Sequence, residues 1–320
     1  MFKNRFVIPY FMDLSLKKQP KVAIVTSTYN QAELLKICLL TLKKNTDYKN
    51  YRVYIVDDSG KGTVGKEIRG VFPWVDVTIN NKNLGFSKTN NIGIKRALKE
   101  YNPDYVLLLN DDTEIIQGNW LKKIVEVGEE DKKIGILGCK IIYPDGTLQN
   151  IGGYIRKWEI VKELKDKKDI FEVDHVMGAF LMIKKEVIKK IGILDEIYSP
   201  YLLEDTDYCL RTKKNGFKVV SVPSVVIVHK KGKSIDSLKD KKKLFIRFKN
   251  DIIFSARHLV FSDALFRIFV YLPLVAILKK KRDEDALRLK NFKLRGDFLI
   301  NLVFYLVSLI YVPLSLLFRK

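Results

Sequence analysis

The sequence predicts an α/β protein with a doubly wound, mostly parallel sheet and a separate C-terminal tail. From Lys21 onward, strand-like apolar runs alternate with helix-like segments, a pattern typical of parallel sheets covered by helices on both faces. Past Gly232 the composition becomes strongly basic and then strongly apolar, which predicts the tail. With 320 residues and 47% hydrophobic content, the chain is long enough to bury a full core.

The expected elements follow from local patterns. Strands are expected where apolar residues run without polar interruption, and helices where they recur every three to four positions. The expected strands are Val22–Thr28, Val53–Val56, Val75–Ile79, Tyr105–Asn110 and Val225–Val228, and the expected helices are Ala32–Lys44 with Asn30 as its N-cap, Ser87–Glu100, Asn119–Asp131 and a helix that begins at Asp205 and stops at Asn215–Gly216.

The stretch from Tyr105 to Glu114 is the most informative. It begins as a strand buried on both faces and ends abruptly in Asn110, Asp111 and Asp112. Ligands bind beyond the carboxyl ends of strands in open α/β sheets, and adjacent carboxylates there suit a divalent cation that carries phosphates. The alternative is that these residues only turn the chain and cap the next helix.

Two other expected strands also end in polar residues, at Thr28 and at Asp57–Asp58. Right-handed crossovers place all three ends along one edge of the sheet, so their convergence favours a binding site over three unrelated turns.

The segment from Gly60 to Gly65 formally fits the dinucleotide-binding pattern G-x-G-x-x-G. Its context does not fit, because two aspartates precede it and Asn80–Asn81 end the next strand, where an acidic residue would be required. We interpret it as a flexible turn.

The net charge of +21 favours anionic partners, such as nucleotides, nucleic acid or acidic lipids, without choosing among them. The three cysteines, Cys38, Cys139 and Cys209, lack metal-ligand spacing and are interpreted as core residues in a reducing compartment. Residues 1–20 have no apolar run typical of a secretory signal, so we expect the catalytic part to be cytoplasmic.

Four ordered motifs, found between about Lys21 and Lys233, together resemble the family 2 glycosyltransferases, of the rhamnosyltransferase-like branch. They are Val25–Asn30, Val56–Ser59, Asn83–Phe86 with Asn90–Asn91, and Leu109–Thr113. The resemblance implies a GT-A fold, a nucleotide-sugar donor and inversion of the anomeric centre.

The resemblance also implies roles for individual residues on the donor side. Thr28 and Asp58 would contact the donor's base, and Asp111–Asp112 would form a D-x-D-like element that holds ribose and metal. Asn110 replaces the first aspartate of that element, which leaves Asp112 as the main carboxylate ligand of Mn²⁺ or Mg²⁺. The full expected donor-binding set is Thr28, Asn30, Asp58, Gly85, Asn90 and Asp111.

His229 follows the short strand Val225–Val228. A lone histidine at a strand end is usually a surface or packed residue, but similar enzymes place a metal-binding histidine after such a strand. We therefore expect His229 to be the second metal ligand.

The second half supplies the acceptor side. Met177–Met182 is similar to the family's acceptor-side segment, and Asp205 opens the next helix, where the macrodipole favours an ionised carboxylate. Inverting transfer requires a base beside the acceptor hydroxyl, and the resemblance implies Asp205 as that base, with Glu204 positioning the hydroxyl. The alternative is that Asp205 is the N-cap, with Asp207 inside the first turn.

The tail favours contact with a membrane. Residues 230–249 hold nine Lys or Arg, which suits anionic lipid or an ordinary solvated helix face. Leu259–Leu278 is apolar but contains Pro273 and, at i,i+4 spacing, Asp263 and Arg267, which favours a segment that is interfacial or folded back over one that spans the membrane. Phe298–Phe318 has no charged residue and is long enough to span a bilayer, although a hairpin lying on the membrane is an alternative.

The sequence thus predicts an N-terminal arm (1–20), a GT-A domain (21–235) with a nucleotide-sugar-binding half (21–118) and an acceptor half (119–235), and a membrane-associating helical tail (236–320). We expect an inverting, metal-dependent hexosyltransferase at the cytoplasmic face of the cell membrane. It would move one sugar from a nucleotide diphosphate donor to a glycan or lipid-linked acceptor, with no nucleic acid partner. A processive synthase is disfavoured, because the Q-x-x-R-W signature is absent from the sequence. The alternatives are a non-catalytic protein that binds membrane surfaces or polyanions, and a sugar-phosphate nucleotidyltransferase.

Overall fold

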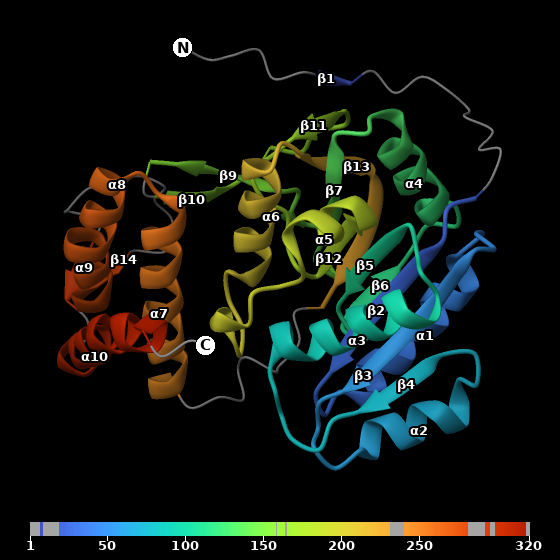
Figure 1. The fold of residues 1–320 in the computed structure, drawn as a ribbon, viewed down its shortest axis with the longest axis horizontal. Coiled ribbons are helices and arrows are strands. Elements are labelled where there is room, and N and C mark those ends of the chain that lie inside the picture. Colours follow the sequence, from blue (N-terminus) through green and yellow to red (C-terminus); the bar gives the residue numbers. More distant parts are fainter. Residues whose placement is uncertain are drawn as a thin grey trace. The chain divides into compact units, whose positions relative to one another are not determined.

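The computed structural model describes residues 7–8, 19–157, 159–163, 165–230, 240–280, 292–294 and 298–317. The chain divides into two compact units (Figure 1). We call residues 1–154 and 160–232 the sheet unit, and residues 155–159 and 233–320 the helical unit. Most of the predicted N-terminal arm lies outside the described residues.

The described elements, in chain order, are β1 (Val7–Ile8), β2 (Val22–Thr28), α1 (Ala32–Asn45), β3 (Tyr51–Asp57), α2 (Thr63–Val71), β4 (Asp76–Ile79), α3 (Phe86–Glu100), β5 (Tyr105–Leu109), β6 (Thr113–Ile115), α4 (Trp120–Glu130), β7 (Ile134–Ile142), β8 (Leu148–Asn150), β9 (Gly153–Arg156), β10 (Glu159–Lys162), β11 (Ile170–Glu172), β12 (Phe180–Lys184), α5 (Lys185–Ile191), η1 (Glu196–Tyr198), α6 (Glu204–Lys214), β13 (Lys218–His229), α7 (Asp240–His258), α8 (Phe261–Phe266), the π-helix η2 (Arg267–Tyr271), α9 (Leu272–Ile277), β14 (Leu278–Lys280), β15 (Phe292–Leu294) and α10 (Phe298–Leu317).

The sheet has the strand order β1-β11-β13-β7-β12-β5-β2-β3-β4, with β6 paired to β13 and β8 paired to β7. Strands β4, β3, β2 and β5 are mutually parallel, and so are β7 and β13. The antiparallel strand β12 joins the two parallel parts. The predicted mostly parallel α/β sheet is therefore confirmed, and the carboxyl ends of β2, β3, β4 and β5 share one edge.

Both faces of the sheet are buried, and successive residues of each central strand belong to different cores. In β2, Val22 and Ile24 join a cluster with α1, α2 and α4, whereas Ala23 and Val25 join a second cluster with α3, α5 and α6. This follows from the alternation of side chains along a strand. The fold is doubly wound, as predicted (Figure 1).

Three local expectations differ from the structure. Asn30 is not the N-cap of α1, because its φ of 55° is left-handed and Gln31 occupies the cap position. The glycine-rich segment contains an unpredicted helix, α2, in which a Cβ on Gly65 would lie 2.8 Å from Ile79. Gly65 is therefore needed for close packing. The last strand of the sheet begins at Lys218, seven residues before the predicted start.

The helical unit is built mainly from α7, α8, α9 and α10, so the predicted tail is helical. Its aromatic rings interlock, with the rings of Phe248 on α7 and Tyr305 on α10 5.6 Å apart. Arg267 pairs with Asp251 of α7, although the sequence spacing suggested Asp263 as its partner.

None of the described helices combines the length and the apolar composition that crossing a membrane requires. The expectation that Phe298–Phe318 spans a bilayer is therefore not supported. Within this segment, α10 buries the polar side chains of Asn301 and Ser308.

Candidate active site

The first part of the site lies where the parallel strands end, and backbone hydrogen bonds bind these ends together. The Asp58 N–H donates to the Thr28 carbonyl at 2.8 Å, and the Asn80 N–H donates to the Asp57 carbonyl at 2.8 Å. Each bond joins the residue after one strand to the end of its neighbour. The polar residues that end β2, β3 and β4 are thus fixed side by side.

Asp58 organises the loop that follows β4. Its buried carboxylate accepts hydrogen bonds from the Asn80 side-chain amide at 2.8 Å and from the Leu84 and Gly85 backbone N–H groups at 3.0 and 2.9 Å. Both carboxylate oxygens are therefore engaged by the protein. In this geometry Asp58 shapes the loop that follows β4, and its contact with the donor's base stays a prediction.

Gly85 allows a close approach between two distant loops. Its φ of +82° is left-handed, and a Cβ there would lie only 2.5 Å from the Cα atom of Pro200. The Phe86 N–H donates to the Pro200 carbonyl at 2.6 Å. The loop that precedes α6 is thus held against the start of α3.

That same loop holds Leu202 and Leu203 in left-handed conformations, with φ values of 80° and 71°. Bulky residues rarely adopt such angles, and strained backbone of this kind clusters at functional sites. The strain lies immediately before Glu204 and Asp205, the predicted catalytic pair.

The two asparagines of α3, Asn90 and Asn91, hydrogen-bond to other segments of the fold. Asn90 is buried and donates to the Ser27 hydroxyl at 3.1 Å and to the Phe86 carbonyl at 3.0 Å. Asn91 exchanges two hydrogen bonds with the backbone of Leu194 and also donates to Glu196. Asn90 therefore acts on the predicted donor site by positioning α3 on β2, whereas the exposed Asn30 lies at the surface beyond β2.

Asp111 and Asp112 are both buried at the end of β5. The pKa of Asp111 is raised to about 7, first by burial and then by the charge of Asp112, while the Thr28 hydroxyl opposes the rise. Among the described residues, Asp111 Oδ2 has no hydrogen-bond partner. A buried carboxylate oxygen without a partner costs free energy. A hydroxyl donor or a cation bound against Asp111 Oδ2 would therefore stabilise the carboxylate.

His229 lies beside Asp112. Strand β13 pairs with β6 so that His229 stands opposite Thr113, and the Lys230 N–H donates to the Asp112 carbonyl at 2.9 Å. This register places His229 Nε2 3.1 Å from Asp112 Oδ1. On the other side of the ring, His229 Nδ1 lies 2.8 Å from Gln149 Oε1.

These contacts fit a divalent cation. Gln149 Oε1 can only accept a hydrogen bond, so Nδ1 carries a hydrogen and Nε2 is the ring nitrogen that faces the Asp112 carboxylate. A divalent cation coordinated by both this ring nitrogen and the carboxylate oxygen would stabilise their close approach. The described residues contain no cluster of three or more His, Cys, Asp or Glu suited to a metal. A two-ligand site is normal for Mg²⁺-like ions, which take their remaining ligands from phosphates and water.

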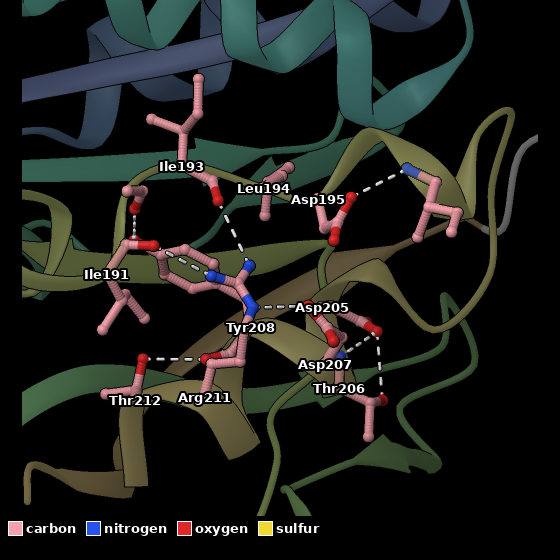
Figure 2. A network of polar contacts seen from close by, with 12 residues as sticks. Ile191, Ile193, Leu194, Asp195, Asp205, Thr206, Asp207, Tyr208, Arg211 and Thr212 are labelled. Carbon is pink, nitrogen blue, oxygen red and sulfur yellow. Dashed lines mark hydrogen bonds and ion pairs between the residues drawn. The ribbon is translucent and has the colours of Figure 1, made fainter. Parts of the chain in front are cut away.

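Asp205 is held by two segments. Its Oδ2 atom accepts from the Gly178 N–H at 2.7 Å. Its Oδ1 atom accepts from the Thr206 N–H at 2.6 Å (Figure 2). Helix α6 begins at Glu204, with Leu203 at the cap position and no side-chain cap. The alternative that Asp205 is the N-cap is therefore wrong. Glu204 is buried beside it.

The turn that binds Asp205 also binds the end of β5. Gly178 donates to Asp205, and the carbonyl of the next residue, Ala179, accepts from the Asn110 N–H at 3.1 Å. Asn110 immediately precedes Asp111. A single turn thus connects the predicted base to the predicted donor carboxylates.

Arg211, near the end of α6, holds the first turn of the same helix through Asp207 (Figure 2). It donates to the fully buried carboxylate of Asp207 at 2.7 Å and to the carbonyls of Ile191 and Ile193 at 3.1 and 3.2 Å. The bonds to Ile191 and Ile193 join α6 to the last residue of α5 and to the segment that follows it. They hold the helix that presents Glu204 and Asp205.

This mostly parallel sheet, with carboxylates at its strand ends and a separate helix that begins with Glu204 and Asp205, defines a GT-A-like glycosyltransferase. The chain belongs to glycosyl transferase family 2, whose model matches residues 23–192. The family match favours sugar transfer over the two alternatives, an inert polyanion-binding protein and a nucleotidyltransferase.

Individual relatives agree with this family. The chain is 25% identical over 250 residues to the low-salt glycan biosynthesis hexosyltransferase Agl10 of Haloferax volcanii, covering 73% of this chain and 78% of that protein. It is 25% identical over 214 residues to the dTDP-rhamnosyl transferase RfbF of Shigella flexneri, covering 64% and 67%. These names are consistent with the rhamnosyltransferase-like branch. Of two other relatives the chain spans only 24% and 18% of the length.

The fold also resembles solved structures. The mannosyltransferase PcManGT from Pyrobaculum calidifontis, in complex with GDP-Man and Mn²⁺, superposes with a TM-score of 0.53 at 13% identity, over 93% of this chain and 76% of that one. This likeness shows the fold.

The sequence patterns did not identify three residues of the site. Gln149 orients His229, Asn80 holds Asp58, and Arg211 anchors α6. Gln149 and Arg211 lie outside the four resembling motifs and carried no spacing signal. Asn80 could have been found, because it ends β4 at the same edge as the other polar residues.

Proposed function

We propose that this chain transfers one sugar from a nucleoside diphosphate sugar to a glycan or lipid-linked acceptor, with inversion at the anomeric carbon and with a divalent metal, Mn²⁺ or Mg²⁺. The observation that carries the proposal is the turn at Gly178–Ala179, which ties Asp205 to the strand end that bears Asp111 and Asp112. A base on one side and donor-binding carboxylates on the other is the arrangement that a single displacement requires.

Asp205 is proposed to take the proton of the acceptor hydroxyl as its oxygen attacks the anomeric carbon. The bond from that carbon to the diphosphate oxygen breaks, and the nucleoside diphosphate departs with the electron pair. Each carboxylate oxygen of Asp205 already accepts a hydrogen bond from the protein, at 2.7 and 2.6 Å, yet keeps a second lone pair for this proton. The two fixed bonds orient the carboxylate, which is the entropic part of general-base catalysis.

Asp112 and His229 are proposed to hold the metal, which when bound would neutralise charge on the departing diphosphate. The relevant support is their 3.1 Å separation and the Gln149 contact that orients the ring. PcManGT, the similar fold described above, was solved with GDP-Man and Mn²⁺, which agrees with this chemistry. Asp111, whose Oδ2 atom has no hydrogen-bond partner in the part of the chain that the structure describes, is proposed to accept a hydrogen bond from the ribose.

The proposal is tested by thermal denaturation with nucleoside diphosphates and their sugars, each with and without Mn²⁺. Ligand at about one hundred times its dissociation constant should add about 2.7 kcal/mol to the free energy of unfolding. At least one nucleotide should stabilise the protein, and more strongly with Mn²⁺. The stabilising donor is then used in a transfer assay with glycan and lipid-linked acceptors. Failure of every nucleoside diphosphate to stabilise the protein would overturn the proposal.

A further inference from the structure

The helical unit buries polar side chains. Asn250, Ser255, Asn301 and Ser308 are each 0% exposed. Polar side chains cost free energy when they leave water, so in soluble helical bundles they mostly lie outside. Here α7 and α10 turn them inward.

The same unit exposes large apolar side chains in two stripes. The first follows the segment from α8 to α9 and contains Phe261, Leu265 and Phe269, and the second lies on α10 and contains Val303, Leu306 and Ile310. Their spacing of three or four residues places each set on one side of its helix. Phe261 is 79% exposed and Ile310 is 67% exposed. We call these two sets the apolar stripes.

The helical unit also buries an ion pair, in addition to its buried polar and exposed apolar side chains. The guanidinium of Arg267 lies 2.6 Å from the carboxylate of Asp251, with side chains only 7% and 10% exposed. Arg267 and Phe269 belong to the same π-helix turn, yet the charge points inward and the phenylalanine outward. Charges paired inside and aromatic rings outside are the distribution that proteins adopt against lipid.

The charge of the unit favours one kind of lipid. Residues 230–249 hold nine Lys or Arg, and Lys242 and Arg247 are exposed on α7. Basic side chains beside an apolar helix surface are attracted to acidic headgroups. A second copy of the chain is disfavoured as the covering partner, because two copies that each carry a net charge of +21 repel one another.

We propose that the apolar stripes dock the protein onto the surface of an anionic phospholipid bilayer, with the helices of this unit lying in the interface. The proposal depends on the helical unit alone and is independent of the donor and of the reaction. It would bring the enzyme to the same surface as a lipid-linked acceptor.

The test is flotation of the purified full chain with two kinds of vesicle, one of pure phosphatidylcholine and one of phosphatidylcholine and phosphatidylglycerol in equal parts. The test variant carries Phe261→Ser and Phe269→Ser. The matched control is Leu40→Ser, because Leu40 is 59% exposed on α1 of the sheet unit. Wild type and control should float with the anionic vesicles and bind neutral ones more weakly. The double variant should lose affinity at least about tenfold, because two aromatic side chains no longer enter the lipid.

Circular dichroism, melting temperature and nucleotide stabilisation are measured on every variant, so loss of folding or of donor binding is recognised separately. If the double variant does not fold, Ile310→Ser probes the second stripe. The proposal is overturned if wild type does not float, or if the folded variants float like wild type. It is also overturned if centrifugation without lipid shows a stable oligomer that these substitutions dissociate, because the stripes would then be covered by a second copy.

Discussion

Both ring nitrogens of His229 contact a side chain: Nδ1 lies 2.8 Å from Gln149 Oε1, and Nε2 lies 3.1 Å from Asp112 Oδ1. Gln149 comes from β8 and Asp112 from the end of β5. The contact with the glutamine orients the ring so that Nε2 faces Asp112, the nitrogen that we propose as the metal ligand.

Gln149→Leu should weaken Mn²⁺ binding about 10- to 100-fold, since loss of a partner that orients a metal-binding histidine typically costs this much. Gln149→Glu keeps an oxygen acceptor and should restore much of the affinity. Titration of Mn²⁺ in the presence of a nucleoside diphosphate, followed by electron paramagnetic resonance, measures it. Gln117→Leu is the matched control, because Gln117 accepts from the backbone of Val226 on the same strand. Equal Mn²⁺ affinity in the Gln149→Leu and Gln117→Leu proteins would contradict the orienting role.

Asp112→Asn should abolish the Mn²⁺-dependent part of nucleotide stabilisation, and His229→Ala should weaken it. The physical reason is loss of the carboxylate charge in the first variant and of one of two protein ligands in the second. Melting curves with nucleoside diphosphate, with and without Mn²⁺, provide the measurement. The metal assignment fails if both variants keep the metal-dependent increment of wild type.

Asp205→Asn should lower the rate of sugar transfer about 10²- to 10⁴-fold, the usual cost of losing a general base. Donor affinity should change little. The asparagine keeps one oxygen but turns an NH₂ group toward the N–H of Gly178 or Thr206, so the melting temperature must be compared in parallel. A folded Asp205→Asn protein with normal transfer would move the base to Glu204.

Gly85→Ala should destabilise the protein and slow transfer, because the added Cβ would lie 2.5 Å from the Cα atom of Pro200 at a left-handed φ. The left-handed conformation alone costs about 1 kcal/mol for alanine, and displacement of the loop before α6 adds to this cost. Gly118→Ala is the control, since a Cβ there meets no atom within 4 Å. Urea unfolding and transfer rates are measured on both. Identical behaviour of the two variants would show that the loop is not held by this contact.

Arg211→Met should lower the free energy of unfolding by about 2–4 kcal/mol, because it leaves the Asp207 carboxylate buried without its cation. Arg211→Lys should recover only part of this, since an ammonium group cannot reproduce the planar set of three bonds. Arg96→Met is the comparison, because its partners Asp76 and Glu100 are 41% and 39% exposed, and exposed pairs contribute at most about 1 kcal/mol. A similar loss in the Arg96 and Arg211 variants would contradict the buried-anchor role.

Much of the fold could be predicted from periodicity. Strand β2 was predicted with its observed ends, and α1 and α3 to within one residue, because each has a clear buried face. Helix α2 was missed because Gly62 and Gly65 read as a turn, whereas Gly65 is a packing residue whose N–H donates to Asp57. Local propensity cannot report a contact that is made only after the sheet has formed.

The site could be predicted only in part. The strand-end carboxylates have a local signal, since polar residues follow apolar runs. The contact of His229 with Asp112 depends on the register between β13 and β6. The orientation of Asp205 depends on a hydrogen bond from Gly178, which lies 27 residues earlier in the chain. Such long-range placements come from topology, which single-sequence patterns do not encode. The roles of these residues in donor binding, metal binding and catalysis stay predictions.

The division of each central strand between two cores has a consequence for evolution and for engineering. Leu107 belongs to the cluster beneath α1 and α4, and its neighbour Leu108 to the cluster beneath α3 and α5. The backbone of β5 therefore separates two hydrophobic clusters. Substitutions on opposite sides should combine with nearly independent effects on stability, whereas those on the same side should be coupled. Inserting one residue in such a strand would exchange the two sides for everything beyond it, so an insertion within β5 should cost more stability than one in the loops between strands and helices.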